Sequence, residues 1–137
     1  MPESVYLFDT NVIAVLIRNR DEKLAGRIQH VQPQGLILPE PVIHEIERGL
    51  LHRGASVRLR YFHEIVAPQY NIVPVQLADW HTAATFWAFT KSRGRQLSDS
   101  DLLLGVMTVR LGGILVTDDR DFAHLPIVPT ENWLQSD

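Results

Sequence analysis

Short apolar runs that alternate with longer segments of helical periodicity constrain the fold of this chain more than any other feature. Strands are predicted at 5–8, 36–38, 72–75 and 114–116, with a fifth candidate at 127–128. Helices are predicted between them, at 12–16, 22–31, 41–50, 57–66, 79–91 and 98–111. This alternation is typical of a parallel sheet covered on both faces. We therefore expect an α/β fold with four to five parallel strands and helices on both faces.

Proline and glycine residues mark several ends of these segments. Pro41 suits the first turn of a helix, the helix at 57–66 should end before Pro68, and Gly112 with Gly113 should stop the last helix. A chain of 137 residues fits one compact domain, and no repeat, low-complexity segment or linker divides it. We expect a single domain over residues 1–137.

The composition excludes some classes of chemistry. There are no cysteines, so disulfides, thiolate metal sites and thiol nucleophiles are ruled out. The segment 1–4 lacks the basic and apolar pattern of an export signal, and no apolar stretch reaches the roughly 20 residues that span a bilayer. We expect a cytoplasmic protein without a membrane partner.

Positive charge is unevenly distributed in a chain whose formal net charge is −3. Phosphate contacts require only local Lys and Arg residues, although solvated helix faces are the simpler explanation of such groups. The two groups are Arg48, Arg53, Arg58 and Arg60, and then Lys91, Arg93 and Arg95.

Acidic residues recur where strands end and helices begin. Asp9 ends the first predicted strand, Asp118 and Asp119 follow the fourth, and Glu45 and Asp101 lie in the first turns of two helices. Ligands of open α/β sheets bind beyond the carboxyl ends of the strands, where a right-handed topology can gather these side chains. Clustered carboxylates repel each other unless a cation lies among them, and oxygen ligands suit Mg²⁺ or Mn²⁺. The chemistry that commonly uses such a cluster is phosphoryl transfer.

Each acid also has a purely structural explanation. The segment 9–11 and the Ser98–Asp101 pair are good helix caps, Glu45 and Glu47 fit a solvated helix face, and 118–121 fits a polar turn. Only their joint placement favours a site.

Other motifs favour no second activity. His44 and Glu45 begin a zinc-protease pattern, but Arg48 stands where the second histidine is required. No glycine-rich phosphate loop or nucleophile elbow is present. The aromatic residues of one predicted helix are expected to belong to the core rather than to a base-stacking surface, and they are Trp80, Phe86, Trp87 and Phe89.

Four blocks of the chain together resemble the PIN-domain family. They are Phe-Asp-Thr-Asn at 8–11, the apolar-Glu helix at 42–49, Asp-Leu-Leu-Leu-Gly at 101–105, and Leu-Val-Thr-Asp-Asp-Arg-Asp-Phe at 115–122. Gly105 stands where members of the family often have Ala. Short single-domain members are mostly toxins of the VapC type.

The resemblance implies a Mg²⁺-dependent ribonuclease, with Mn²⁺ as the second candidate metal, that hydrolyses RNA phosphodiester bonds. It further implies a homodimer that a small antitoxin protein neutralises. The resemblance assigns metal binding and catalysis to Asp9, Glu45, Asp101 and Asp119, with supporting roles for Thr10, Asn11 and Thr117.

Several alternatives remain open at the level of the sequence. The last acid is Asp118, Asp119 or Asp121, and distance from Thr117 favours Asp119; Asp99 has no assigned role. A structure-specific DNA nuclease or a phosphatase could use the same cluster, although Asn11 replaces the second Asp of the aspartyl-phosphate phosphatases. A receiver domain also gathers acids around Mg²⁺, but it requires a late lysine that this chain lacks. A PIN-like scaffold acting only as a binding module is the third alternative.

Overall fold

A computed structural model describes residues 4–19, 21–32, 35–125 and 127–134. Its centre is a parallel sheet of five strands in the order β3-β2-β1-β4-β5, which confirms the predicted α/β class. The strands are β1 (Tyr6–Phe8), β2 (Leu36–Pro39), β3 (Asn71–Val73), β4 (Ile114–Val116) and β5 (Thr130–Glu131).

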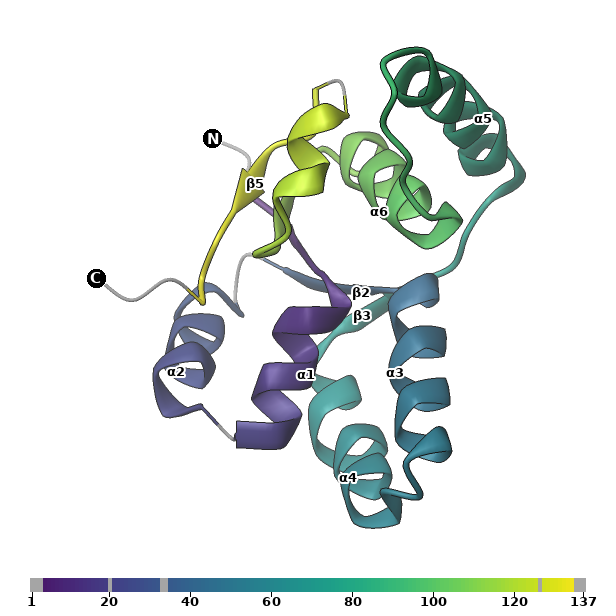
Figure 1. Cartoon of the computed structure of the whole chain (residues 1–137). Helices are drawn as coiled ribbons and strands as arrows, with labels where there is room; N and C mark the ends of the chain where they lie inside the picture. Colours follow the sequence, from purple (N-terminus) through teal and green to yellow (C-terminus); the bar gives the residue numbers. More distant parts are fainter. Residues whose placement is uncertain (1–3, 20, 33–34, 126, 135–137) are drawn as a thin grey trace.

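Helices connect successive strands and cover the sheet (Figure 1). The chain moves outward from β1 to β3 and then returns to β4, so right-handed crossovers place the helices before β3 and those after β3 on opposite faces. Within the described ranges, no helix is long and apolar enough to cross a membrane. The helices are α1 (Thr10–Asn19), α2 (Glu22–Val31), α3 (Glu40–His52), α4 (Ser56–Tyr61), α5 (Leu77–Ser92) and α6 (Asp99–Arg110).

The fifth strand was predicted at the wrong residues. It forms at Thr130–Glu131 and not at 127–128, because Ile127 has a φ of 54° and is 78% exposed. A β-branched residue in this left-handed region cannot continue a strand. Pro129 then contributes only its carbonyl, which accepts from the backbone N–H of Leu115 at 2.9 Å, as suits an edge strand.

The helix predicted at 57–66 extends further than expected. After α4 the chain continues as a π-helical turn, η2 (Phe62–Val66), and a 3₁₀ turn, η3 (Ala67–Gln69), so the helical path passes Pro68. Proline is tolerated there because the first residues of a helical turn donate no backbone hydrogen bond within it. Phe62 and Val66 are buried and anchor the segment to the core.

The prediction that all four aromatic residues of α5 belong to the core was wrong for two of them. Phe86 is 7% exposed, whereas Trp80 and Trp87 are 49% and 46% exposed, and Phe89 is partly buried. At 100° per residue these four positions lie around the helix rather than on one stripe. One face of α5 therefore carries tryptophan on the surface.

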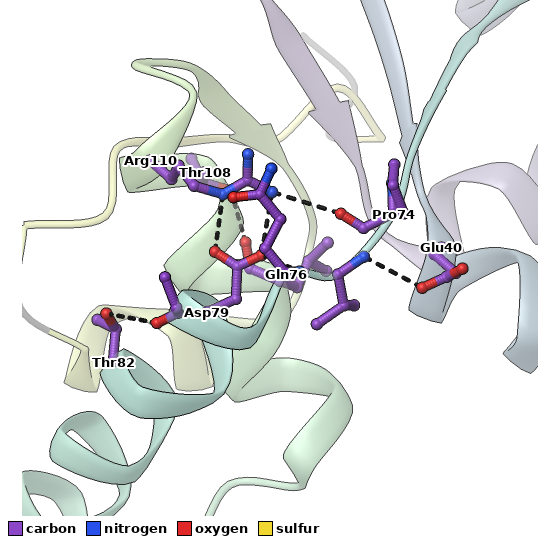
Figure 2. Close-up of polar contacts among 10 residues, drawn as sticks. Glu40, Pro74, Gln76, Asp79, Thr82, Thr108 and Arg110 are labelled. Carbon is purple, nitrogen blue, oxygen red and sulfur yellow. Dashed lines mark hydrogen bonds and ion pairs between the residues drawn. The ribbon is translucent and has the colours of Figure 1, made fainter.

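A buried ion pair fixes α5 against α6 (Figure 2). Arg110, at the end of α6, donates through Nε to Oδ1 of Asp79 at 2.7 Å and through Nη2 to Oδ2 at 3.0 Å. The same carboxylate accepts from the backbone N–H of Gln76 at 2.9 Å and so caps α5. Asp79 is 1% exposed. This bidentate contact fixes the position of α6 relative to α5, and the opposite end of α6 carries Asp101.

Candidate active site

The predicted acids meet where the direction of the sheet connections reverses. β1 and β4 are neighbours, with Phe8 opposite Val116, and the backbone N–H of Asp9 donates to the carbonyl of Val116 at 3.1 Å. The crossover after β1 runs along one face of the sheet and the return to β4 along the other, which makes this the topological switch point. Asp9 and the segment that begins at Thr117 therefore lie where ligands of open α/β sheets bind.

Two hydrogen bonds hold the Asp9 carboxylate in place. Oδ1 accepts from the backbone N–H of Thr10 at 2.7 Å, and Oδ2 accepts from the hydroxyl of Thr117 at 2.7 Å. Asp9 is 6% exposed. Burial raises the pKa of this carboxyl above its ordinary value, the two hydrogen bonds oppose that rise, and the charges of Glu45 and Asp119 add to it.

Asp101 takes part in the cap of α6 through its backbone, while its carboxyl lies within range of the other acids. The Ser98 hydroxyl oxygen accepts from the backbone N–H of Asp101 at 3.1 Å and caps α6. The Asp101 carboxyl still belongs to the acidic group. Burial raises its pKa to about 6, and the charges of Asp9, Asp119 and Glu45 contribute to that rise. The two roles are compatible because the cap uses the Ser98 hydroxyl and the backbone N–H of Asp101, which leaves the Asp101 carboxylate available to the acidic group.

Among the three candidates for the last acid, the geometry favours Asp119. Asp118 and Asp121 are exposed, whereas Asp119 is partly buried and its charge raises the pKa of both Asp9 and Asp101. Its backbone N–H donates to the hydroxyl of Thr117 at 3.0 Å, and its Oδ1 accepts from the backbone N–H of Asp121 at 2.9 Å. Asp119, which caps η4 (Arg120–His124), therefore lies close enough to Asp9 and Asp101 for its charge to act on both.

The two glutamates of α3 have different surroundings. Oε2 of Glu47 contacts Nε2 of His63 at 2.7 Å, on the exposed side of the helix. Glu45 is partly buried, and its charge acts on Asp9 and Asp101. Two positions correspond to about 200° around a helix, so the pair cannot share a face. Only Glu45 belongs to the acidic group.

A cavity of about 470 Å³ opens beside these acids, between α1, α3 and α4; we call it the α1–α3–α4 cavity. Thr10, Asn11 and Glu45 line it toward the acids, and Arg18, Arg53 and Arg58 also line it. Arg53 and Arg58 belong to the first arginine group noted in the sequence, whereas Arg18 was missed. The spacing between Asn11 and Arg18 could have predicted this position. Seven residues correspond to two turns of a helix, so the two side chains lie on the same face of α1.

The donor chemistry of this group fits a hard divalent cation. All four acids supply oxygen, and burial together with the charges of the neighbouring acids raises the pKa of Asp9 and Asp101. Within the described ranges, the buried hydroxyl of Thr10 has no hydrogen-bond partner. In the same part of the chain, no three acidic or histidine side chains are assembled closely enough to hold one ion as they stand. Binding would therefore require side-chain movement.

The fold and the site together define a class of protein: an α/β domain with a group of carboxylates at the topological switch point of its sheet. The model of the PIN domain matches residues 6–128, and the chain belongs to this family. A relative is Ribonuclease VapC1 of Haemophilus influenzae strain R2866, which is 25% identical over 137 residues, with 94% of this chain and 98% of the relative covered.

Solved structures share the fold at lower identity. The DNA-bound VapBC of Salmonella typhimurium superposes with a TM-score of 0.85 at 16% identity, over 95% of this chain and 98% of that one. VapBC2 of Rickettsia felis, bound to a promoter DNA fragment, gives 0.83 at 16% identity, over 94% and 98%. VapBC-1 of nontypeable Haemophilus influenzae gives 0.82 at 20% identity, over 96% and 99%.

Proposed function

We propose that this protein is a Mg²⁺-dependent endoribonuclease, active also with Mn²⁺, that hydrolyses RNA phosphodiester bonds as the toxin of a toxin–antitoxin pair. The observation that carries the proposal is the convergence of Asp9, Glu45, Asp101 and Asp119 at the switch point, where their charges act on one another. The name of the Haemophilus relative, Ribonuclease VapC1, supports RNA as the substrate. Such a toxin would act in the cytoplasm.

The chain's own groups have separable tasks in this mechanism. The four carboxylates would hold the metal, which when bound supplies an activated water and stabilises charge on the leaving oxygen. Thr117 and the backbone of Thr10 keep Asp9 in one orientation. Asn11 is exposed at the cavity wall and can donate to a substrate phosphate. The arginines of the α1–α3–α4 cavity neutralise the flanking phosphates of the RNA.

The metal-binding part of the proposal is tested by removing one charge without changing volume. Asp9→Asn and Asp101→Asn should each reduce cleavage of single-stranded RNA by orders of magnitude while circular dichroism remains native. Asp118→Asn is the matched control, because Asp118 is exposed and adjacent to the cluster. EDTA should stop cleavage and Mg²⁺ or Mn²⁺ should restore it. Full activity of Asp9→Asn would exclude the proposed site.

The products identify the reaction. Attack by water on phosphorus, with cleavage of the P–O3′ bond and protonation of the leaving 3′ oxygen, leaves a 5′-phosphate and a 3′-hydroxyl, and it requires no ribose 2′-hydroxyl. A 2′,3′-cyclic phosphate formed equally in EDTA would contradict the mechanism. Duplex DNA and a phosphoester chromophore, assayed in parallel, separate the ribonuclease from a DNA nuclease or a phosphatase.

The toxin part of the proposal rests on the partners of the structural neighbours, which are VapBC complexes. An Arg or Lys of an antitoxin could enter the acidic pocket and compete with the metal. Expression alone should arrest bacterial growth, Asp9→Asn should not, and a small protein encoded beside the gene should rescue growth. We further propose a homodimer, for which light scattering should give twice the 15.6 kDa chain mass. A monomeric protein whose expression does not affect growth would contradict the proposed toxin function, but it would not contradict the proposed nuclease activity.

A further inference from the structure

A second cationic hollow lies away from the acids, between the end of α5 and η4. Its volume is about 400 Å³, and we call it the α5–η4 hollow. None of its lining residues is acidic, although the chain carries a net charge of −3. Such a local excess of positive charge attracts polyanions. The lining residues are Phe89, Thr90, Arg93, Arg95, Ala123 and His124.

Arg93 is held in a conformation that suits nucleic-acid binding. Its guanidinium carbon lies 3.7 Å from the centre of the Phe89 ring, and Nη1 donates to the Phe89 carbonyl at 3.2 Å and to the Ser92 hydroxyl at 3.3 Å. Among the described residues, Nε and Nη2 have no partner. A stacked guanidinium that is already ordered loses little entropy on binding phosphate or a base.

Arg95 adds a second free cation to the hollow. Its side chain is exposed and has no partner in the part of the chain that the structure describes. Lys91, also exposed, lies in the last turn of α5 and outside the lining of the hollow, with Nζ 6.0 Å from the Trp87 ring centre. Arginine and aromatic groups placed together are the elements that bind single-stranded nucleic acid without sequence preference.

The segment η4 connects the α5–η4 hollow to Asp119, one of the four acids. Ala123 lines both this hollow and a neighbouring one of about 330 Å³, which Thr117 and Asp119 also line. η4 begins directly after Asp119 and, at the rise of a 3₁₀ helix, is about 10 Å long. The hollow therefore lies within a few nucleotides of Asp119, so one nucleic-acid strand is long enough to contact both. This proximity favours a nucleic acid over an acidic protein as the occupant.

Two arginine-bearing hollows are therefore connected to the acids. Arg18, Arg53 and Arg58 line the α1–α3–α4 cavity, which Glu45 also lines, and Arg93 and Arg95 line the α5–η4 hollow, whose segment η4 begins directly after Asp119. We propose that the α5–η4 hollow binds the single-stranded part of the RNA substrate on one side of the cleaved bond, through Arg93 and Arg95. The substrate's identity as RNA rests on the proposed ribonuclease function, whereas the binding site does not require catalysis.

The test is binding in the absence of cleavage. In an Asp9→Asn background, fluorescence anisotropy with a labelled single-stranded RNA of about 12 nucleotides measures affinity. Arg93→Gln with Arg95→Gln should weaken binding at least tenfold and reduce the slope of log affinity against log salt by about 1.4, as two lost phosphate contacts require. Lys23→Glu is the control: it changes the net charge equally at an exposed position on α2. Arg95→Gln alone provides the test if the double variant is misfolded.

Kinetics in the Asp9 wild-type background add a second readout. The double variant should raise KM for the 12-nucleotide RNA and leave kcat unchanged, while a dinucleotide, which extends only one nucleotide to either side of the cleaved bond and cannot reach the hollow, should be unaffected. Equal affinity of the double variant and Lys23→Glu would overturn the proposal. So would a loss of poly-glutamate binding without any loss of RNA binding. Absence of cleavage by the wild type, with RNA binding weakened as expected, would contradict the proposed function alone.

Discussion

Thr117 donates a hydrogen bond to Oδ2 of Asp9 across 2.7 Å, although 108 positions separate the two residues. The same hydroxyl accepts from the backbone N–H of Asp119 at 3.0 Å. Thr117 is 4% exposed. One buried hydroxyl therefore connects the acid after β1 to the turn that carries the acid after β4.

Thr117→Val should separate this role from packing. Valine preserves the shape but leaves Asp9 without its donor, so we expect a loss of about 1.5–3 kcal/mol in the free energy of unfolding. Cleavage should fall roughly 10- to 100-fold, as for other residues that orient metal ligands. Thr117→Ser retains the hydroxyl and should keep most of the activity. Denaturant titration and cleavage kinetics measure both effects, and a fully active Val variant would contradict this role.

The stability of the metal-free protein should depend on pH through Asp101. Its pKa is about 6 in the folded state against an ordinary value of 3.8, so between these values the folded state binds more protons than the unfolded state. Stability from this group is present below about pH 4 and is lost as pH rises through about 6. In EDTA, Asp101→Asn should therefore raise Tm relative to wild type at about pH 7.5 and not at about pH 4. Asp118→Asn should show no such difference, and an equal shift of Tm at both pH values for Asp101→Asn would contradict the assignment.

Removing Arg110 should destabilise the fold strongly. Arg110→Ala leaves the carboxylate of Asp79, which is 1% exposed, without its counter-charge, at a cost of about 3 kcal/mol. Arg95→Ala removes an exposed cation and should change stability by less than about 0.5 kcal/mol. Urea unfolding of the two variants makes the comparison. Equal midpoints would show that the Asp79–Arg110 pair does not stabilise the packing of α5 on α6.

Two glycines should respond oppositely to alanine. A Cβ at Gly113 would lie 2.7 Å from Cδ1 of Leu7 and 3.1 Å from the backbone oxygen of Val5, so Gly113→Ala should destabilise by about 1–3 kcal/mol. A Cβ at Gly26, inside α2, meets nothing within 4 Å, so Gly26→Ala should stabilise by about 0.5–1 kcal/mol. Thermal unfolding distinguishes the two, and a stabilised Gly113→Ala would show that β1 and β4 can move apart.

Local patterns predicted much of the fold because they report short-range preferences. The apolar runs before Asp9 and Thr117 form β1 and β4, and Ser98 caps α6 as its spacing indicated. Predictions failed where no local signal exists. The position of the fifth strand depends on its pairing with β4 and on the left-handed backbone of Ile127. Neither feature can be predicted from the apolar character of Ile127 and Val128.

Taken alone, the order of residues determined that acids follow buried strands, and therefore that a parallel sheet would bring Asp9 and the segment after Val116 to one edge. It favoured Asp119 over Asp118 and Asp121 by distance from Thr117, but it did not exclude the other two. That choice depends on the hydroxyl of Thr117, which binds Asp9 and the backbone of Asp119 at once.

Tertiary structure alone likewise placed Arg18 of α1 beside Arg53 and Arg58, and brought the end of α5 against η4. Helical periodicity records which residues share a face of one helix. Packing between segments far apart in the chain decides which helix that face contacts. Each of these long-range contacts depends on the packing of the rest of the core.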